Sequence, residues 1–178
     1  MKLMVLVGAV VCVGVAAASA QAPAVQKPGA EQKKFEAFVG TWTYEGESKA
    51  NPFSPAGKVA GTDVYEMLPG GFFVTHHWDE KNPIASVKGV ETWGYDPSKK
   101  AYAYNYYTSL GEMGSGTIAV SGNAWTFSSS GVAFDGKRAW SKCVTTVVSP
   151  TSLTVSCDTS TDGKTWSPGV FTGKWTKK

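Results

Sequence analysis

Residues 101–108 read Ala101-Tyr-Ala-Tyr-Asn-Tyr-Tyr-Thr108, and the alternation within this stretch indicates the fold of the chain. Successive side chains of a β-strand point to opposite faces, so residues two positions apart share a face. Tyr102, Tyr104 and Tyr106 therefore lie on one face, and alanine and asparagine occupy the other. Asp96-Pro97, a dipeptide typical of turns, precedes the stretch. The stretch predicts a β-strand with one large aromatic face.

Comparable stretches lie on both sides of residues 101–108, separated by short turn sequences such as Gly122-Asn123 and Asp162-Gly163. The expected strands span residues 41–49, 58–67, 72–79, 86–95, 101–108, 116–121, 124–129, 138–148, 153–159 and 170–176. About ten short strands joined by brief turns predict one antiparallel sheet. Closing that sheet into an up-and-down β-barrel removes its exposed edges. The predicted class is therefore all-β, a single antiparallel barrel.

Helical character is confined to residues 31–38, where Phe35 and Phe38 are three positions apart behind charged residues and Gly40 follows. Between residues 110 and 116, glycines recur too irregularly to hold a phosphate, and we expect a flexible loop at the barrel rim. The predicted barrel is thus preceded by one short N-terminal helix.

The composition of the 178 residues excludes several classes of protein. Hydrophobic residues make up 42% and aromatic residues 12%, which is too much for a disordered chain. The 17 Lys and Arg residues exceed the 14 Asp and Glu residues by only three, so we expect no nucleic-acid partner. The length suits one domain. Nothing in the sequence indicates an oligomeric state.

The N-terminus has the pattern of a secretory signal peptide. A positive start is followed by an apolar run over residues 3–17 and by Ala18-Ser19-Ala20, which predicts cleavage after Ala20. The run is shorter than the roughly 20 residues that span a membrane, so we expect no membrane span. The predicted organisation is a signal peptide at residues 1–20, a flexible tether at 21–30 and the barrel domain at 31–178. The mature protein is expected to be periplasmic or secreted.

Two cysteines remain after the expected cleavage, and their placement predicts a disulfide. A hairpin turning at residues 149–152 aligns Cys143 with Cys157, Thr145 with Val155 and Val147 with Leu153. Facing residues on neighbouring strands are close to disulfide reach. We expect the Cys143–Cys157 bridge in the oxidising compartment that the signal peptide indicates. The alternative is a pair of reduced, buried cysteines.

The segment Phe38-Val-Gly-Thr-Trp-Thr-Tyr-Glu-Gly46 resembles the opening of lipocalin-like (calycin) barrels, in which a short helix leads into Gly-x-Trp on the first strand. With Leu68-Pro-Gly-Gly-Phe-Phe73, Gly122-Asn-Ala-Trp-Thr-Phe127 and Lys174-Trp-Thr-Lys177, the pattern over residues 35–177 is similar to a bacterial domain-of-unknown-function family of exported calycin-type proteins. The resemblance implies a barrel with a cavity and no particular reaction. In many lipocalins a basic residue stacks on this tryptophan, and Lys174 is the nearby candidate.

One-sided aromatic rows on the expected strands supply candidate ligand-binding residues. These are Trp42, Tyr44, Trp93, Tyr102, Tyr104, Tyr106 and Trp125. Aromatic walls with a few hydroxyl groups suit a small, flat, apolar ligand. The alternative is ordinary core packing, and for Trp42 we favour a structural plug at the closed end of the barrel.

His76 and His77 are the two histidines of the chain, so imidazole chemistry would depend on them. His77 shares a strand face with Asp79, which gives two potential metal ligands where catalytic zinc usually has three. A haem protein would need one histidine as axial ligand. The simplest interpretation is that both histidines are solvated at a strand end, with no metal or cofactor.

Common enzyme motifs are absent from the sequence, which has no Gly-x-Ser-x-Gly, phosphate-binding loop or His-Glu-x-x-His. We therefore expect an exported, non-catalytic protein that binds a small apolar ligand in the barrel cavity. The alternatives are a haem- or metal-dependent protein using His76 or His77, and a structural or protein-interaction module without a ligand.

Overall fold

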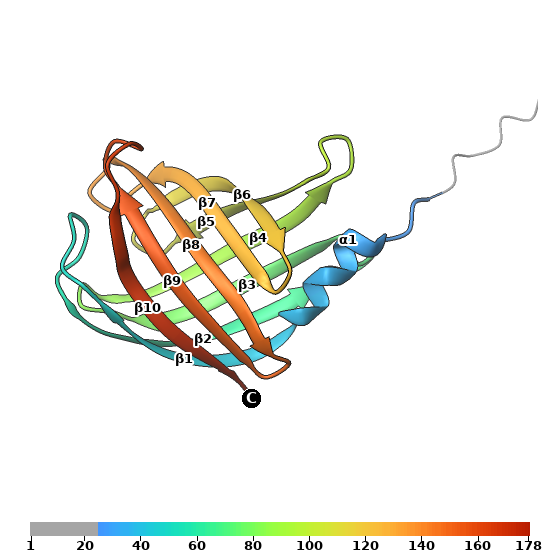
Figure 1. The fold of residues 1–178 in the computed structure, drawn as a ribbon, viewed down its shortest axis with the longest axis horizontal. Helices are drawn as coiled ribbons and strands as arrows, with labels where there is room; N and C mark the ends of the chain where they lie inside the picture. The colour runs from blue at the N-terminus through green and yellow to red at the C-terminus, as the bar shows by residue number, and fades with distance from the viewer. Residues whose placement is uncertain (1–24) are drawn as a thin grey trace, which may run out of the picture.

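The computed structural model describes residues 25–178, which form one short helical segment followed by ten β-strands (Figure 1). The helical segment consists of α1 (Ala30–Lys33) and a 3-10 turn, η1 (Lys34–Ala37). The strands are β1 (Gly40–Ser48), β2 (Gly57–Met67), β3 (Phe73–Lys81), β4 (Ser86–Asp96), β5 (Ala101–Thr108), β6 (Met113–Ser121), β7 (Ala124–Val132), β8 (Arg138–Ser149), β9 (Ser152–Ser160) and β10 (Ser167–Lys177). The expected signal peptide and the first part of the expected tether lie outside the described residues.

The strands form a closed antiparallel barrel in the order of the chain. Each strand pairs with its sequence neighbours, and β1 pairs with β10 to close the sheet. This confirms the predicted up-and-down barrel. No helix among residues 25–178 is long and apolar enough to cross a membrane.

The expected loop at residues 110–116 is wrong in its second half, because β6 begins at Met113. Two of the three glycines of this segment face large rings on β5: Gly114 pairs with Tyr106, and Gly116 pairs with Tyr104. A Cβ at Gly116 would lie 2.6 Å from the Tyr104 ring, so glycine is what allows the strand to continue here. Packing against the tyrosines of β5 therefore explains why glycine occupies positions 114 and 116.

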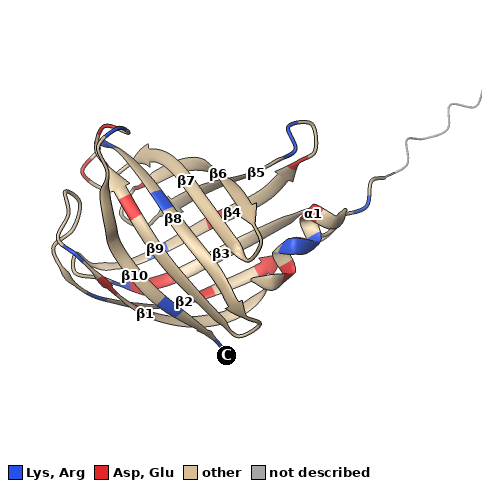
Figure 2. Cartoon of the chain, viewed as in Figure 1, with Lys and Arg blue, Asp and Glu red and all other residues tan. Residues whose placement is uncertain are grey.

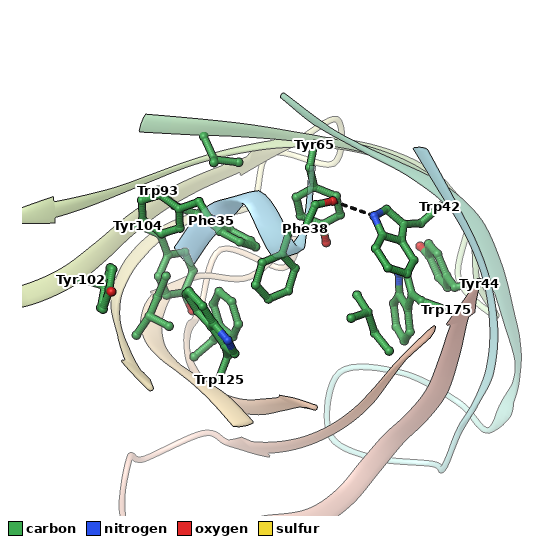
Figure 3. Close-up of a cluster of buried hydrophobic side chains, with 14 of the residues drawn as sticks. Phe35, Phe38, Trp42, Tyr44, Tyr65, Trp93, Tyr102, Tyr104, Trp125 and Trp175 are labelled. Atoms are coloured by element: carbon green, nitrogen blue, oxygen red, sulfur yellow. Dashed lines mark hydrogen bonds between the residues drawn. The ribbon is translucent and has the colours of Figure 1, made fainter. Parts of the chain in front are cut away.

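The helical segment closes one end of the barrel (Figures 1 and 3). Phe35 and Phe38 point from it into the barrel and are almost completely buried among aromatic rings, including Trp93 and Trp125. Trp42 is fully buried, and its Nε1 donates to the carbonyl oxygen of Phe38 at 2.7 Å. Trp42 is therefore the plug of this end, as favoured from the sequence.

The basic residue over the Trp42 ring is Lys177 rather than Lys174. The Nζ atom of Lys177 lies 5.2 Å from the ring centroid, within the range of a cation–π contact. The register of β1 and β10 explains the difference, because Trp42 pairs with Lys177 whereas Lys174 pairs with Glu45 and is exposed.

The β8–β9 hairpin has the predicted register. Cys143 pairs with Cys157, Thr145 with Val155 and Val147 with Leu153, and the two cysteines form a disulfide. The bridge closes a short loop, and cross-links of this size stabilise proteins by about 3 kcal/mol, chiefly by restricting the unfolded chain. The disulfide prediction is confirmed.

Candidate ligand-binding cavity

A cavity of about 490 Å³ occupies the part of the barrel away from the helix. Its lining extends from Phe38 at the floor to the turns that join β1 to β2, β3 to β4, β5 to β6 and β7 to β8. These turns form the mouth, where Phe53, Ile84 and Phe134 lie. The volume is in the range of natural small-molecule sites.

The structure divides the aromatic residues singled out in the sequence into two groups. Trp93, Tyr104 and Tyr106 line the cavity. Tyr44 also points inward, where it stacks on Trp175 with ring centroids 4.5 Å apart.

The remaining candidates, Trp42, Tyr102 and Trp125, pack around the helical segment at the closed end (Figure 3). Tyr102 donates a hydrogen bond to the carboxylate of Glu31 on that segment. These three side chains build the floor beneath the cavity and do not line it.

Small residues allow the aromatic side chains to lie along the wall. Trp78 on β3 pairs with Gly89 on β4, and a Cβ at Gly89 would lie 1.9 Å from the indole. Tyr104 packs in the same way against Gly116. Because the Trp78 and Tyr104 rings lie over the glycines of the neighbouring strands, they add apolar surface to the wall without filling the centre of the barrel.

Three charged residues meet inside the barrel: Asp63 on β2, His76 on β3 and Glu91 on β4. The Nδ1 atom of His76 is 3.1 Å from a Glu91 oxygen, and its Nε2 atom is 3.4 Å from an Asp63 oxygen. Trp93 Nε1 donates to Glu91 at 2.7 Å, and Trp175 Nε1 donates to Asp63 at 2.6 Å. Indole donors thus hold both carboxylates in place.

His76 is a buried cation at neutral pH. Burial alone lowers the pKa of His76, but the hydrogen bonds and charges of Asp63 and Glu91 outweigh it and raise the pKa to about 9. The Tyr65 ring stacks on the imidazole at a centroid distance of 4.0 Å. The expectation of a solvated histidine is therefore wrong for His76, which is 9% exposed.

The sequence contains a signal for part of this cluster. In the β3–β4 hairpin His76 faces Glu91, and in the β2–β3 hairpin it faces Tyr65. Alignment of these hairpins about their turns therefore predicts an imidazole beside a carboxylate. The contact of Asp63 with Trp175 spans 112 residues and arises from barrel closure.

A second polar group lies nearer the mouth. Glu80 accepts hydrogen bonds from Tyr44 Oη and from Asn82 Nδ2, each at 2.8 Å. Glu112 accepts one from Thr108 Oγ1 at 3.1 Å. Burial raises the pKa of Glu112, and the negative charge of Glu80 raises it further.

His77 and Asp79 lie on the outer face of β3 and are exposed. Asp79 pairs with Lys88 at 2.8 Å, so these two residues lie away from the cavity. Among residues 25–178, no three His, Cys, Asp or Glu side chains are arranged to hold a metal ion. His76 does not fit an axial haem ligand either, because both of its ring nitrogens face carboxylates.

Ten antiparallel strands closed into a barrel, with a helix over one end and a cavity reaching the other, define a calycin-like (lipocalin-type) fold. The sequence profile of the family described as "Protein of unknown function (DUF1579)" matches residues 27–176. The chain belongs to this family, which agrees with the resemblance seen in the sequence. No curated protein matches the sequence.

Solved structures share the fold at low sequence identity. Rv2717c from M. tuberculosis superposes with a TM-score of 0.60 at 12% identity, covering 84% of this chain and 98% of its own. The S-type phycobiliprotein lyase CPES from Guillardia theta gives a TM-score of 0.55 at 12% identity, covering 83% of this chain and 92% of its own. At this identity the likeness concerns the fold.

Proposed function

We propose that this protein binds a small, largely apolar molecule inside its barrel and that it is an exported, non-catalytic binding protein. The main support for this proposal is the cavity of about 490 Å³. Its walls are largely aromatic, and the buried polar side chains of Asp63, His76 and Glu91 lie at its floor. An apolar pocket with few, well-placed polar groups is the usual form of a small-molecule site. The walls supply affinity, and the polar groups orient the guest.

The state of His76 argues against a role as a general base. A general base needs a free nitrogen lone pair near the operating pH. His76 is held between Asp63 and Glu91 with its pKa raised to about 9, so it is protonated at neutral pH. The cluster therefore serves as a fixed floor for a guest.

The disulfide supports export, because such bridges persist in oxidising compartments. The sequence pattern at residues 1–20 supports the same conclusion. The intact mass of the protein from its own host tests this. We expect a chain beginning at Gln21 with one disulfide, and a chain retaining Met1–Ala20 would contradict export.

The binding proposal is tested with N-phenylnaphthylamine, a neutral dye whose fluorescence rises in apolar surroundings. Ser129 and Ser128 are neighbours on β7, but Ser129 lines the cavity and Ser128 is exposed on the outer face. We expect saturable binding of one dye per chain. Ser129→Trp should lower its affinity at least about tenfold by filling the cavity, whereas Ser128→Trp should leave it unchanged.

A second variant guards against loss of folding. Ser141 faces Ser129 from β8, with the two hydroxyl oxygens 2.8 Å apart, so Ser141→Trp fills the same space from another strand. Thermal unfolding shows which variants retain the fold. Absence of dye binding to the native protein, or equal binding by folded Ser129→Trp and Ser128→Trp, would overturn the proposal.

A further inference from the structure

The cavity carries negative charge without matching positive charge. Four carboxylates line it: Asp63, Glu80, Glu91 and Glu112. The single basic group among the described lining residues is His76, and none of these residues is lysine or arginine. On the cartoon, acidic and basic segments are interspersed over the barrel (Figure 2). The cavity itself has an excess of negative charge.

The two carboxylates near the mouth have no basic partner. His76 pairs with both carboxylates at the floor, but none of the ion pairs among residues 25–178 includes Glu80 or Glu112. Both residues line the same cavity, and Glu112 lies in the turn that joins β5 to β6, at the mouth. Tyr44 and Asn82 fix the Glu80 carboxylate by hydrogen bonds. A positive charge between these groups would relieve their repulsion.

The cavity also leaves a buried polar atom for a guest to satisfy. Thr159 Oγ1 is buried without a hydrogen-bond partner among the described residues. Thr159 lines the cavity. Buried polar groups are usually paired, and leaving one unpaired costs about 1–3 kcal/mol. This hydroxyl is separate from the four carboxylates, and it indicates a guest with a polar atom besides its apolar body.

The walls suit an organic cation better than a metal ion. Trp78, Tyr104 and Tyr106 present aromatic rings to the cavity. Such rings attract ammonium groups through their negative faces. The volume far exceeds that of a bare ion, and among residues 25–178 no group of three ligating side chains is placed for a metal.

We propose that the ligand is an aromatic or otherwise apolar amine, bound as an ammonium ion with its positive charge near Glu80 and Glu112 and its apolar body between the aromatic walls. This inference rests on the proposed binding function and specifies the ligand class. It explains why the cavity combines apolar walls with carboxylates that no lysine or arginine compensates.

The test compares three probes with the same naphthalene body: naphthylethylamine, which is cationic at neutral pH, naphthylethanol, which is neutral, and naphthylacetate, which is anionic. Calorimetric titration of the full chain measures each affinity. We expect the amine to bind at least about tenfold more tightly than the alcohol, and the acetate to bind most weakly.

Variants of Glu80 and Glu112 test whether these two carboxylates cause the preference for the amine over the alcohol. The double variant Glu80→Gln with Glu112→Gln should reduce the advantage of the amine over the alcohol to about threefold or less. Asp79→Asn is the matched control, because Asp79 precedes Glu80 in sequence but lies on the outer face. Like each single Glu→Gln variant, it removes one negative charge, and it should leave the tenfold preference intact. If the double variant unfolds, each single variant should show part of the loss.

The outcomes separate this inference from the binding proposal. Equal affinity for the amine and the alcohol, tighter binding of the acetate, or a full amine preference in the folded carboxylate variants would overturn the ligand class and leave cavity binding standing. Failure of all three probes and of N-phenylnaphthylamine to bind would instead overturn the binding proposal, and the ligand class with it.

Discussion

His76 and His77 are adjacent in the sequence but have opposite surroundings. His76 contacts Asp63, Glu91 and Tyr65 inside the barrel, whereas His77 is exposed on the outside. Strand alternation separates them, and the register of two hairpins gives His76 its partners. The alternation could be predicted from the sequence. The partners could not be predicted in full, because Asp63 is held by Trp175 from the opposite end of the chain.

The raised pKa of His76 predicts how stability depends on pH. The group binds its proton more tightly in the folded protein, with a pKa of about 9 against the ordinary histidine value of 6.5. Its contribution is therefore fully present below about pH 6.5 and is lost as the pH rises through 9. The free energy of unfolding should fall by on the order of 3 kcal/mol across this window.

Urea unfolding between pH 6.5 and 9.5 measures this loss, with His76→Gln and His77→Gln as a matched pair. His76→Gln should flatten the profile in this window, and His77→Gln should retain the native slope. A native protein whose stability is flat over the window, or a His76→Gln variant with the native slope, would show that His76 is not the buried cation described here.

Among the larger elements, the β8–β9 hairpin shows what a local pattern can predict. The cysteines and two further facing pairs fix one register, and the structure has that register. The β6 strand shows the opposite case. Gly114 and Gly116 suggest a loop until the tyrosines that face them across β5 are known. Packing against the neighbouring strand decides whether such glycines lie in a loop or in a strand, and the sequence of one segment alone does not show that packing.

The disulfide is predicted to contribute measurably to stability. Replacing Cys143 and Cys157 together with serine releases the loop between them. The free energy of unfolding should fall by about 3 kcal/mol, and the barrel should remain folded because its ladder of strand pairs is intact. Urea unfolding of the oxidised, reduced and double-serine proteins measures the effect. Equal stability of all three would contradict a stabilising bridge.

At the scale of the whole molecule, the sequence was sufficient for the barrel and insufficient for the cavity. Alternation predicts that Tyr102, Tyr104 and Tyr106 share one face, and the structure shows that this face points inward, yet only Tyr104 and Tyr106 line the cavity. The difference between them is depth along the barrel axis: the helical segment fills the end beside Tyr102 and leaves the end beside Tyr106 open. The position of a residue along the barrel axis depends on the stagger between strands in the closed sheet, and strand alternation does not predict that stagger.

The central claim is that a small molecule occupies the interior of this barrel, and intermolecular nuclear Overhauser effects with N-phenylnaphthylamine test it most directly. The account predicts contacts from the dye to Tyr104, Tyr106 and Thr145, which line the cavity. Tyr107 and Met113 pair across β5 and β6 and expose about half of their surfaces on the outside. Contacts confined to these two outer residues would contradict the account.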